Sequence, residues 1–257
     1  MSHVRQEEPA ARGYAVTHPA GLIRPPHDPA WDSLNYATRG VMTVRTRAGS
    51  WVLPPHRAVW VPAELRPELQ LSGRTSLHIL YASQQLHLLP PVCRVVDVTP
   101  LARELVLHAV RTAPLWLDEP VHRRLLGVLA DQLVLLPEAG LQLPLPSDPR
   151  ALDAARRMEL DPADDAPVAE LARRVATSKR SLERLFMAET GMSVARWRRR
   201  ARMLEALRML AAGATASTVA TRVGYATPSA FGVAFRAELG STPAQWAGRA
   251  DNARPGG

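Results

Sequence analysis

The feature that most constrains how this chain can fold is a short motif that occurs twice between Pro167 and Trp246. Ala172 and Ala220, which precede a turn in each copy, are 48 positions apart. Phe186 and Phe235, which follow that turn, are 49 positions apart. The turn of the second copy is therefore one residue longer than the turn of the first.

Each copy has the spacing of a helix-turn-helix. A short helix with a small residue at its crossing point, Ala172 or Ala220, leads into a tight turn. A second helix follows, in which apolar residues recur every three to four positions. These apolar anchors are Leu182, Leu185 and Phe186 in the first copy and Phe231, Ala234 and Phe235 in the second. An uninterrupted helical segment at 194–212, without Gly or Pro, joins the two copies.

Capping residues predict where the second helix of each copy begins and ends. Thr177 or Ser178 is placed to cap this helix in the first copy, and Thr227 takes that place in the second. Gly191 and Gly240 follow the two helices, and glycine readily adopts the left-handed conformation that ends a helix. The region is therefore expected to be all-helical.

Positive charge concentrates in the same region. The chain has a formal net charge of +8, and eleven Arg or Lys residues against three acids lie between Leu171 and Leu210. A basic surface on helices beside a helix-turn-helix is typical of nucleic-acid binding. A solvated helical face without a partner is the simpler alternative.

The second copy carries a more specific pattern. It reads Gly224-Tyr225-Ala-Thr-Pro228-Ser-Ala-Phe231-Gly-Val-Ala-Phe235-Arg236, and Gly240-Ser-Thr-Pro243-Ala-Gln-Trp246 follows. This pattern resembles the DNA-binding domain of the AraC/XylS family of bacterial transcription regulators, over residues 150–249. The resemblance implies double-stranded promoter DNA as the partner, with RNA polymerase as a possible second partner.

The outward positions of the second helices are the candidates for reading DNA bases, because the start of a recognition helix meets base edges in the major groove. The candidates are Lys179, Arg180, Glu183, Arg184, Ser229, Ala230 and Val233. Arginine can hold guanine through two hydrogen bonds. Glu183 either accepts from cytosine or orients Arg184. Candidates for phosphate contact are Thr177, Ser178, Arg222, Thr227 and Arg236.

The two copies differ at these outward positions. The family often carries Arg or another long polar residue at the places of Gly232 and Val233, and this chain does not. We therefore expect the first copy to supply most of the sequence specificity and the second copy mainly to position the protein.

The amino-terminal half predicts a different architecture. Short runs rich in Val, Trp, Tyr and Leu are broken by Pro and Gly from Tyr14 to Ser83, which favours a sandwich or a barrel. Residues 1–14 are expected to be disordered. The run 49–62 resembles the cupin-type sensor domain of one AraC subgroup.

The predicted fold class is therefore α+β with two domains: a cupin-like β-barrel with helices, and an all-α domain with two helix-turn-helix units joined by a long helix. The expected segments are a barrel sensor domain at 1–96, a helical segment at 97–138, a proline-rich linker at 139–149, an AraC-type DNA-binding domain at 150–250 and a tail at 251–257.

The cupin-like region lacks the metal ligands that the resemblance would supply. His27 stands where the first imidazole is expected, but Pro29 and Pro67 occupy the other two places. Zinc and iron sites need three or four N, O or S donors. Asp28, His56 or His78 would have to replace the missing imidazoles, so we expect neither a metal nor another cofactor.

A small-molecule effector is still conceivable in the barrel. The candidate pocket residues are His27, Trp31, Tyr36, Trp51, Trp60 and His78. The alternative is that these side chains simply fill a packed barrel, as they do in most small barrels.

Two helical segments follow the barrel, at 99–110 and 120–136. The second has an apolar stripe at spacings of three and four. Its dimerisation candidates are Val121, Leu125, Val128, Leu129 and Leu133. In regulators of the resembled family such a helix carries the contact of a homodimer; the alternative is packing against its own domain.

Cys93 is the only cysteine, which excludes a disulfide within the chain and fits a reducing cytoplasm. No signal peptide and no apolar run near the ~18 residues of a membrane helix is present in the sequence, so no membrane partner is expected. A cupin metalloenzyme would need the missing ligands, and a DNA-repair methyltransferase would need an activated cysteine. We therefore predict a regulator and not an enzyme. A non-specific architectural DNA binder is the third alternative.

Overall fold

A computed structural model describes residues 8–47, 49–55, 57–136 and 142–246. The chain divides into two compact units, one made of Met1–Thr46 and Leu53–Gly140, the other of Arg47–Val52 and Leu141–Gly257. The change of unit after residue 140 falls within the linker predicted at 139–149. Residues 139–141 of that linker and the tail at 251–257 lie outside the described residues.

The first unit contains an antiparallel sheet. Its strands are β1 (Ala11–His18), β2 (Gly21–Ile23), β3 (Trp31–Thr46), β5 (Arg57–Val61), β6 (Glu68–Ser83) and β7 (Arg94–Asp97). β6 pairs with β1, β2 and β3, while β5 pairs with β3 and β7. Among the described residues this pairing does not close into a ring. The β-rich character of this unit is as expected, and a closed cupin-like barrel stays a prediction.

The two long strands β3 and β6 bend at glycine. Their register shifts between Ala37, Arg39 and Val41, around Gly40. Gly40 has a φ of +79°, and a Cβ at this position would lie 2.4 Å from Thr75 Oγ1. Only glycine tolerates both the left-handed backbone and the close approach, so this residue allows the strand to curve.

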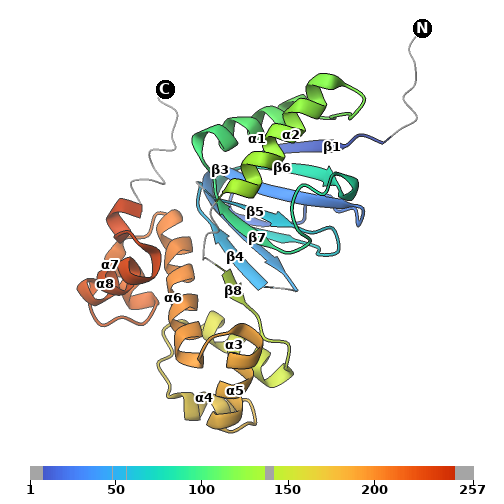
Figure 1. Ribbon diagram of the computed structural model, residues 1–257. Coiled ribbons are helices and arrows are strands. Elements are labelled where there is room, and N and C mark those ends of the chain that lie inside the picture. Colours follow the sequence, from blue (N-terminus) through green and yellow to red (C-terminus); the bar gives the residue numbers. More distant parts are fainter. Residues whose placement is uncertain (1–7, 48, 56, 137–141, 247–257) are drawn as a thin grey trace. The chain divides into compact units, whose positions relative to one another are not determined.

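Two helices cover one face of this sheet, α1 (Pro100–Thr112) and α2 (Pro120–Leu135) (Figure 1). Both segments were expected to be helical. Thr99 caps α1 by accepting a hydrogen bond from the backbone N–H of Ala102. Apolar residues of both helices share a buried cluster with the sheet, including Val106 and Leu129.

The expected apolar stripe of α2 is divided between the core and the surface. Leu129 and Leu133 are buried and Leu125 packs against the same core, whereas Val121 and Val128 are 64% and 47% exposed. The alternative reading, packing on its own domain, therefore describes Leu129 and Leu133.

The expectation of disorder up to residue 14 is wrong where the chain is described. Ala11 is fully buried, begins β1 and lies opposite Ala82 of β6. Its backbone also bridges to Leu115, beyond α1. The segment looks polar, but a Cβ at Gly13 would lie 2.3 Å from Val110 O of α1, so a small residue lets the strand lie close to this helix.

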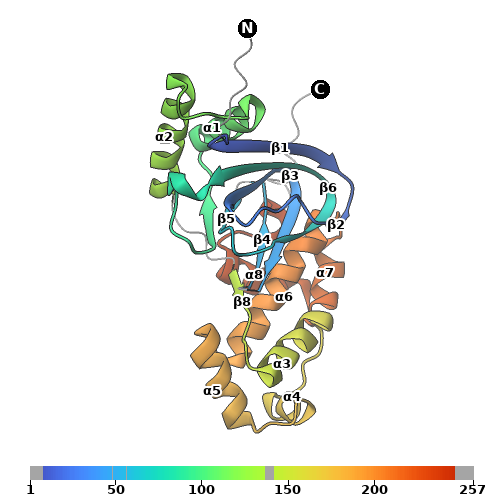
Figure 2. The same ribbon diagram turned by 90° about the vertical axis from the view of Figure 1, so that its right-hand side faces the viewer.

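The second unit is mainly helical. Its helices are α3 (Pro149–Leu160), α4 (Val168–Arg174), α5 (Lys179–Thr190), α6 (Val194–Ala211), α7 (Ala216–Arg222) and α8 (Pro228–Leu239). Helices α4 and α5 lie toward one end of α6, and α7 and α8 toward the other (Figure 2). Within the described residues, no helix combines the length and the apolar character that crossing a membrane requires.

A short strand pair also belongs to the second unit. β4 (Gly49–Leu53) pairs through Gly49, Ser50 and Trp51 with β8 (Gln142–Pro144). Trp51, which was predicted to line a pocket of the amino-terminal barrel, is 1% exposed and belongs to the second unit by its contacts.

Candidate nucleic-acid interface

The first helix-turn-helix consists of α4, a four-residue turn and α5. Ser178 is the cap of α5, and its hydroxyl accepts a hydrogen bond from Ser181 N at 3.1 Å. The turn is closed by Thr177 N, which donates to Ala172 O at 3.0 Å. Phe186 is fully buried and meets Trp197 of α6 edge-on, with the ring centroids 5.7 Å apart. The expected cap and anchor are thus confirmed.

The second helix-turn-helix consists of α7, a five-residue turn and α8. Tyr225 N donates to Ala220 O at 2.8 Å, which matches the bond between Thr177 and Ala172 in the first copy. Thr227 caps α8 by accepting from Ala230 N at 3.1 Å. The repeat seen in the sequence is therefore a repeat of backbone hydrogen bonds, and the extra residue lies after the shared bond.

The beginning of α5 presents basic side chains to solvent. Lys179, Arg180 and Arg184 are exposed, and the last two are one helical turn apart on the same face. Met187, which follows on this side, is 55% exposed. A cationic face at the start of a helix, with the neighbouring Ser178 hydroxyl, fits the edges and phosphates of a major groove.

Glu183 does not belong to this face. Its Oε2 accepts a hydrogen bond from Val194 N at 3.1 Å, at the first residue of α6. The carboxylate therefore satisfies an otherwise unpaired N–H at a helix start, where negative charge is also stabilised by the helix dipole. Because this carboxylate is bonded to α6, the geometry speaks against both expected roles, contact with cytosine and orientation of Arg184. The sequence could not show this, since the spacing of residues within α5 says nothing about contacts with α6.

The beginning of α8 presents a different surface. Ser229, Ala230 and Val233 are exposed, Val233 to 73%. The candidates for phosphate contact, Thr227, Arg222 and Arg236, are exposed as well. The base-reading candidates of α8 are thus small, whereas those of α5 are long and charged.

Much of the basic stretch is used inside the second unit. Arg198 donates to Ala166 O at 2.8 Å, Arg202 donates to Pro162 O at 2.7 Å, and Arg200 pairs with Glu238 at 3.2 Å. Sequence reasoning missed these roles. The only sequence signal was the position of Arg202 among apolar neighbours of α6, a face that burial would favour.

Glu189 is a further residue that the sequence did not single out. Its Oε2 accepts hydrogen bonds from Ser147 N at 2.6 Å and Asp148 N at 3.0 Å. These backbone N–H groups lower the pKa of Glu189. Because Trp197 Nε1 also donates to Pro144 O at 2.8 Å, the end of the predicted linker is bonded to α5 and α6.

The pocket candidates of the first unit do not share one environment. Tyr36 and Trp60 lie in the buried cluster beneath α1 and α2. Trp31 is buried with the Arg12 guanidinium 4.3 Å from its ring centroid, whereas His27 and His78 are half-buried. A cavity of about 460 Å³ in this unit is lined by other residues.

Two observations bear on catalytic alternatives. Burial raises the pKa of the Cys93 thiol to about 12, which is opposite to the shift that an activated acceptor cysteine needs. In the part of the chain that is described, no group of three His, Cys, Asp or Glu side chains is placed to hold a metal ion.

The helical unit matches a known protein family. A family described as "Helix-turn-helix domain" matches residues 171–249. The HTH-type transcriptional regulator NimR of Escherichia coli is 31% identical over 234 residues, which cover 91% of this chain and 86% of that protein. A Streptomyces lividans protein described as AraC-like is 36% identical over 101 residues, which cover 39% of this chain and 33% of that protein.

A solved structure is also similar to the helical unit. It is the DNA-binding domain of AdpA, a global transcriptional factor, in complex with a target DNA. The similarity has 32% identity and a TM-score of 0.39, and it covers 43% of this chain and 100% of that chain.

Two helix-turn-helix units with a basic recognition-type helix define a DNA-binding protein. The match to NimR extends beyond these units to almost the whole chain. The chain belongs to the AraC-type family of helix-turn-helix transcriptional regulators, and it is a DNA-binding transcription regulator.

Proposed function

We propose that α5 and α8 enter adjacent segments of the major groove of promoter DNA, and that α5 carries most of the base reading. The observation that carries this proposal is the contrast between Arg180 and Arg184, exposed on α5, and Ala230 and Val233, exposed on α8. Arginine discriminates guanine by about 1–3 kcal/mol per bidentate pair, whereas small apolar side chains can only meet a thymine methyl group.

Selection of binding sites from random double-stranded DNA tests this function. The expected result is a two-part site in which the half bound by α5 carries more sequence information than the half bound by α8. A protein that enriches no sequence at all would instead be a non-specific architectural binder. Equal information in both halves would contradict the assignment of base reading to α5.

We further propose that the regulator is a homodimer joined through the exposed face of α2. Val121, Val128 and Leu135 recur every seven residues on this face, and all three are exposed. In an antiparallel pair centred on Val128, Val121 would meet Leu135 of the second copy, and exposed Arg124 would lie near exposed Asp131. In such a pair, apolar residues would face apolar residues and a cation would lie near an anion.

The oligomeric state of two variants tests this interface. Val128→Glu is expected to yield a monomer in light scattering, because like charges would meet at the centre. Val134→Glu is the matched control, since Val134 is 56% exposed but lies on another side of α2. A dimer that persists in Val128→Glu would contradict the proposal.

We also propose that a small-molecule effector binds between the sheet and the helices α1 and α2. Trp60 Nε1 and His78 Nδ1 are buried, and neither has a hydrogen-bond partner within the described residues. An unsatisfied buried polar group costs about 1–3 kcal/mol, so a polar small molecule that bonds to either atom would be favoured. Tyr36 lies opposite His78 on the paired strands.

A thermal-shift screen of small polar aromatic compounds would test this site. A compound that stabilises the protein should lose its effect in Trp60→Phe, which keeps an aromatic ring at this position but removes the donor. A compound whose effect survives that change binds elsewhere.

We also propose that the regulator acts in the bacterial cytoplasm, at the nucleoid and near RNA polymerase when it is bound to DNA.

A further inference from the structure

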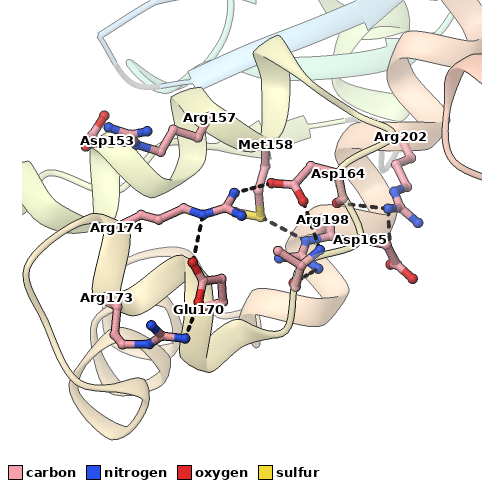
Figure 3. A network of polar contacts seen from close by, with 11 residues as sticks. Asp153, Arg157, Met158, Asp164, Asp165, Glu170, Arg173, Arg174, Arg198 and Arg202 are labelled. Atoms are coloured by element: carbon pink, nitrogen blue, oxygen red, sulfur yellow. Dashed lines mark hydrogen bonds and ion pairs between the residues drawn. The ribbon is translucent and has the colours of Figure 1, made fainter.

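We propose that Arg202 sets the position of the two DNA-reading helices relative to each other, and therefore the spacing of the two halves of the operator. Arg202 lies in the middle of α6 and is only 9% exposed. Its Nε donates to Pro162 O at 2.7 Å. Its Nη2 donates to Asp164 O at 3.2 Å (Figure 3). The guanidinium is thus fixed to the loop that leads into α4.

The second helix-turn-helix reaches the same guanidinium. Gly224, in the turn between α7 and α8, has a φ of +80°. A Cβ at Gly224 would lie 3.0 Å from Arg202 Nη2 and 3.1 Å from Ala163 Cα. The entry loop of the first helix-turn-helix and the turn of the second therefore meet at Arg202. We call this junction of Arg202, the 162–165 loop and Gly224 the brace.

The loop side of the brace is itself held firmly. Arg198, one helical turn before Arg202, donates to Ala166 O at 2.8 Å. Asp164 accepts from Ala166 N at 2.9 Å and pairs with Arg174 of α4 at 2.6 Å (Figure 3). The loop is thus bonded to both α4 and α6, so a shift of α4 would be transmitted to Arg202.

The other side of α6 is bonded to α8. Arg200 Nη1 lies 3.2 Å from Glu238 Oε1, and these side chains are only 13% and 21% exposed. Long helices commonly curve. The bonds of Arg202 to the 162–165 loop and of Arg200 to α8 would restrain α6 against such bending. Arginine suits the brace because its planar fork offers several donors in fixed directions, which a lysine ammonium does not.

The consequence concerns DNA, and it rests on the proposed function that both units bind. Successive major-groove segments on one side of a duplex are about 34 Å apart, and each inserted base pair also rotates one half-site about the axis. A rigid pair of reading helices accepts one spacing and one rotation. Two reading helices that can shift relative to each other would accept several spacings, but they would bind the best site less tightly.

The first experiment measures affinity for a duplex obtained by selection, and for versions with one base pair inserted or removed between its two halves. The wild type should lose at least about tenfold in affinity with either change, equivalent to ~1.4 kcal/mol. Arg202→Met, which keeps an unbranched side chain without the guanidinium and its donors, should reduce that ratio at least fivefold. For Arg202→Lys, which retains a donor for Pro162 O, this ratio should lie between the values of the wild type and Arg202→Met. An unchanged ratio in Arg202→Met would overturn the proposal.

Arg199→Met is the matched control, because Arg199 is exposed on the same helix. It should leave the spacing ratio unchanged, whatever it does to affinity. Melting temperatures of all variants separate loss of spacing from loss of folding. If Arg202→Met does not fold, Arg202→Lys and Asp165→Ala carry the test, since Asp165 accepts from Arg202 Nη2 at 3.3 Å and its side chain is 85% exposed.

A second experiment needs no DNA. Spin labels are attached at Met187→Cys on α5 and Val233→Cys on α8, both exposed positions, in a Cys93→Ser background. The distribution of distances between the labels should be narrow in the parent and clearly broader with Arg202→Met. An equally narrow distribution would refute the brace, even if the protein binds DNA as proposed. The two proposals can also fail separately. If Arg202→Met broadens a narrow distance distribution but the protein selects no DNA sequence, the brace holds and only the proposed function is refuted.

Discussion

The two helix-turn-helix units have nearly the same interior and different outer surfaces. Phe186 and Phe235 are both fully buried, and the bond from Thr177 to Ala172 has its counterpart between Tyr225 and Ala220. On the outside, α5 exposes long cations where α8 exposes small side chains. The comparison teaches that the interior positions determine the shape of each unit, while the few outward positions at the start of a helix are free to determine which bases it reads.

The largest expected effect tests whether the two interiors are equivalent, and it comes from removing the buried phenylalanine of each copy. Phe186→Ala and Phe235→Ala should each cost about 3–5 kcal/mol of unfolding free energy, because each deletes a large, fully buried ring. Urea denaturation of both variants measures this directly. A loss below about 1 kcal/mol in either one would show that the interiors are not equivalent.

The next largest effect separates base reading from phosphate contact. Arg184→Ala should cost about 1–3 kcal/mol on the selected site and much less on scrambled DNA, so sequence preference relaxes. Arg222→Ala should weaken both DNAs alike and lower the slope of log affinity against log salt by about 1. Gel-shift titrations at several salt concentrations distinguish them. Equal losses on both DNAs for Arg184→Ala would remove the difference between α5 and α8.

The helix caps provide a smaller and symmetric test. Ser178→Ala and Thr227→Ala should each destabilise the protein by about 1 kcal/mol, since each hydroxyl accepts a backbone N–H at the start of its helix. Circular dichroism during urea unfolding checks the size. If the two costs differ by more than about 1 kcal/mol, the starts of α5 and α8 are held by different interactions.

The smallest predicted effect depends on pH and belongs to the first helix-turn-helix alone. The backbone N–H of Ala166 and the Arg174 guanidinium lower the pKa of Asp164 from its ordinary value of 3.8. A lowered pKa stabilises the folded state above that ordinary value, and the contribution is lost as pH falls through the folded pKa. The positions that match Asp164 in the second copy, Ala212 and Gly213, carry no carboxyl group.

Asp164→Asn should therefore be less stable than the wild type at pH 6, and the difference should vanish as the pH falls below 3.8, the ordinary value for Asp164. Urea midpoints at a series of pH values measure this. Asp153→Asn is a control with an exposed i,i+4 pair to Arg157, and it should show little difference at any pH. A gap for Asp164→Asn that persists in acid would mean that packing, and not ionisation, causes it.

Local patterns in the sequence were sufficient for the repeat, the anchors, the cap of α8 and the extra residue of the second turn, and they narrowed the cap of α5 to Thr177 or Ser178. Spacing along one helix and the chemistry of a cap involve residues only a few positions apart, so the sequence by itself determines them. The class of the protein was predicted from the resemblance of the motif between Gly224 and Trp246 to the AraC/XylS family, and the basic stretch agrees with it.

Only the tertiary structure decided where long polar side chains point and which segments cover an edge. Glu183 turns to α6, Arg202 turns to a loop some forty positions earlier, and Ala11 is buried by a strand and a segment far along the chain. A charged side chain several bonds long can reach solvent, DNA or a backbone carbonyl, and the sequence does not record the distance to any of them. Its role is chosen by whichever partner the fold brings within hydrogen-bond reach.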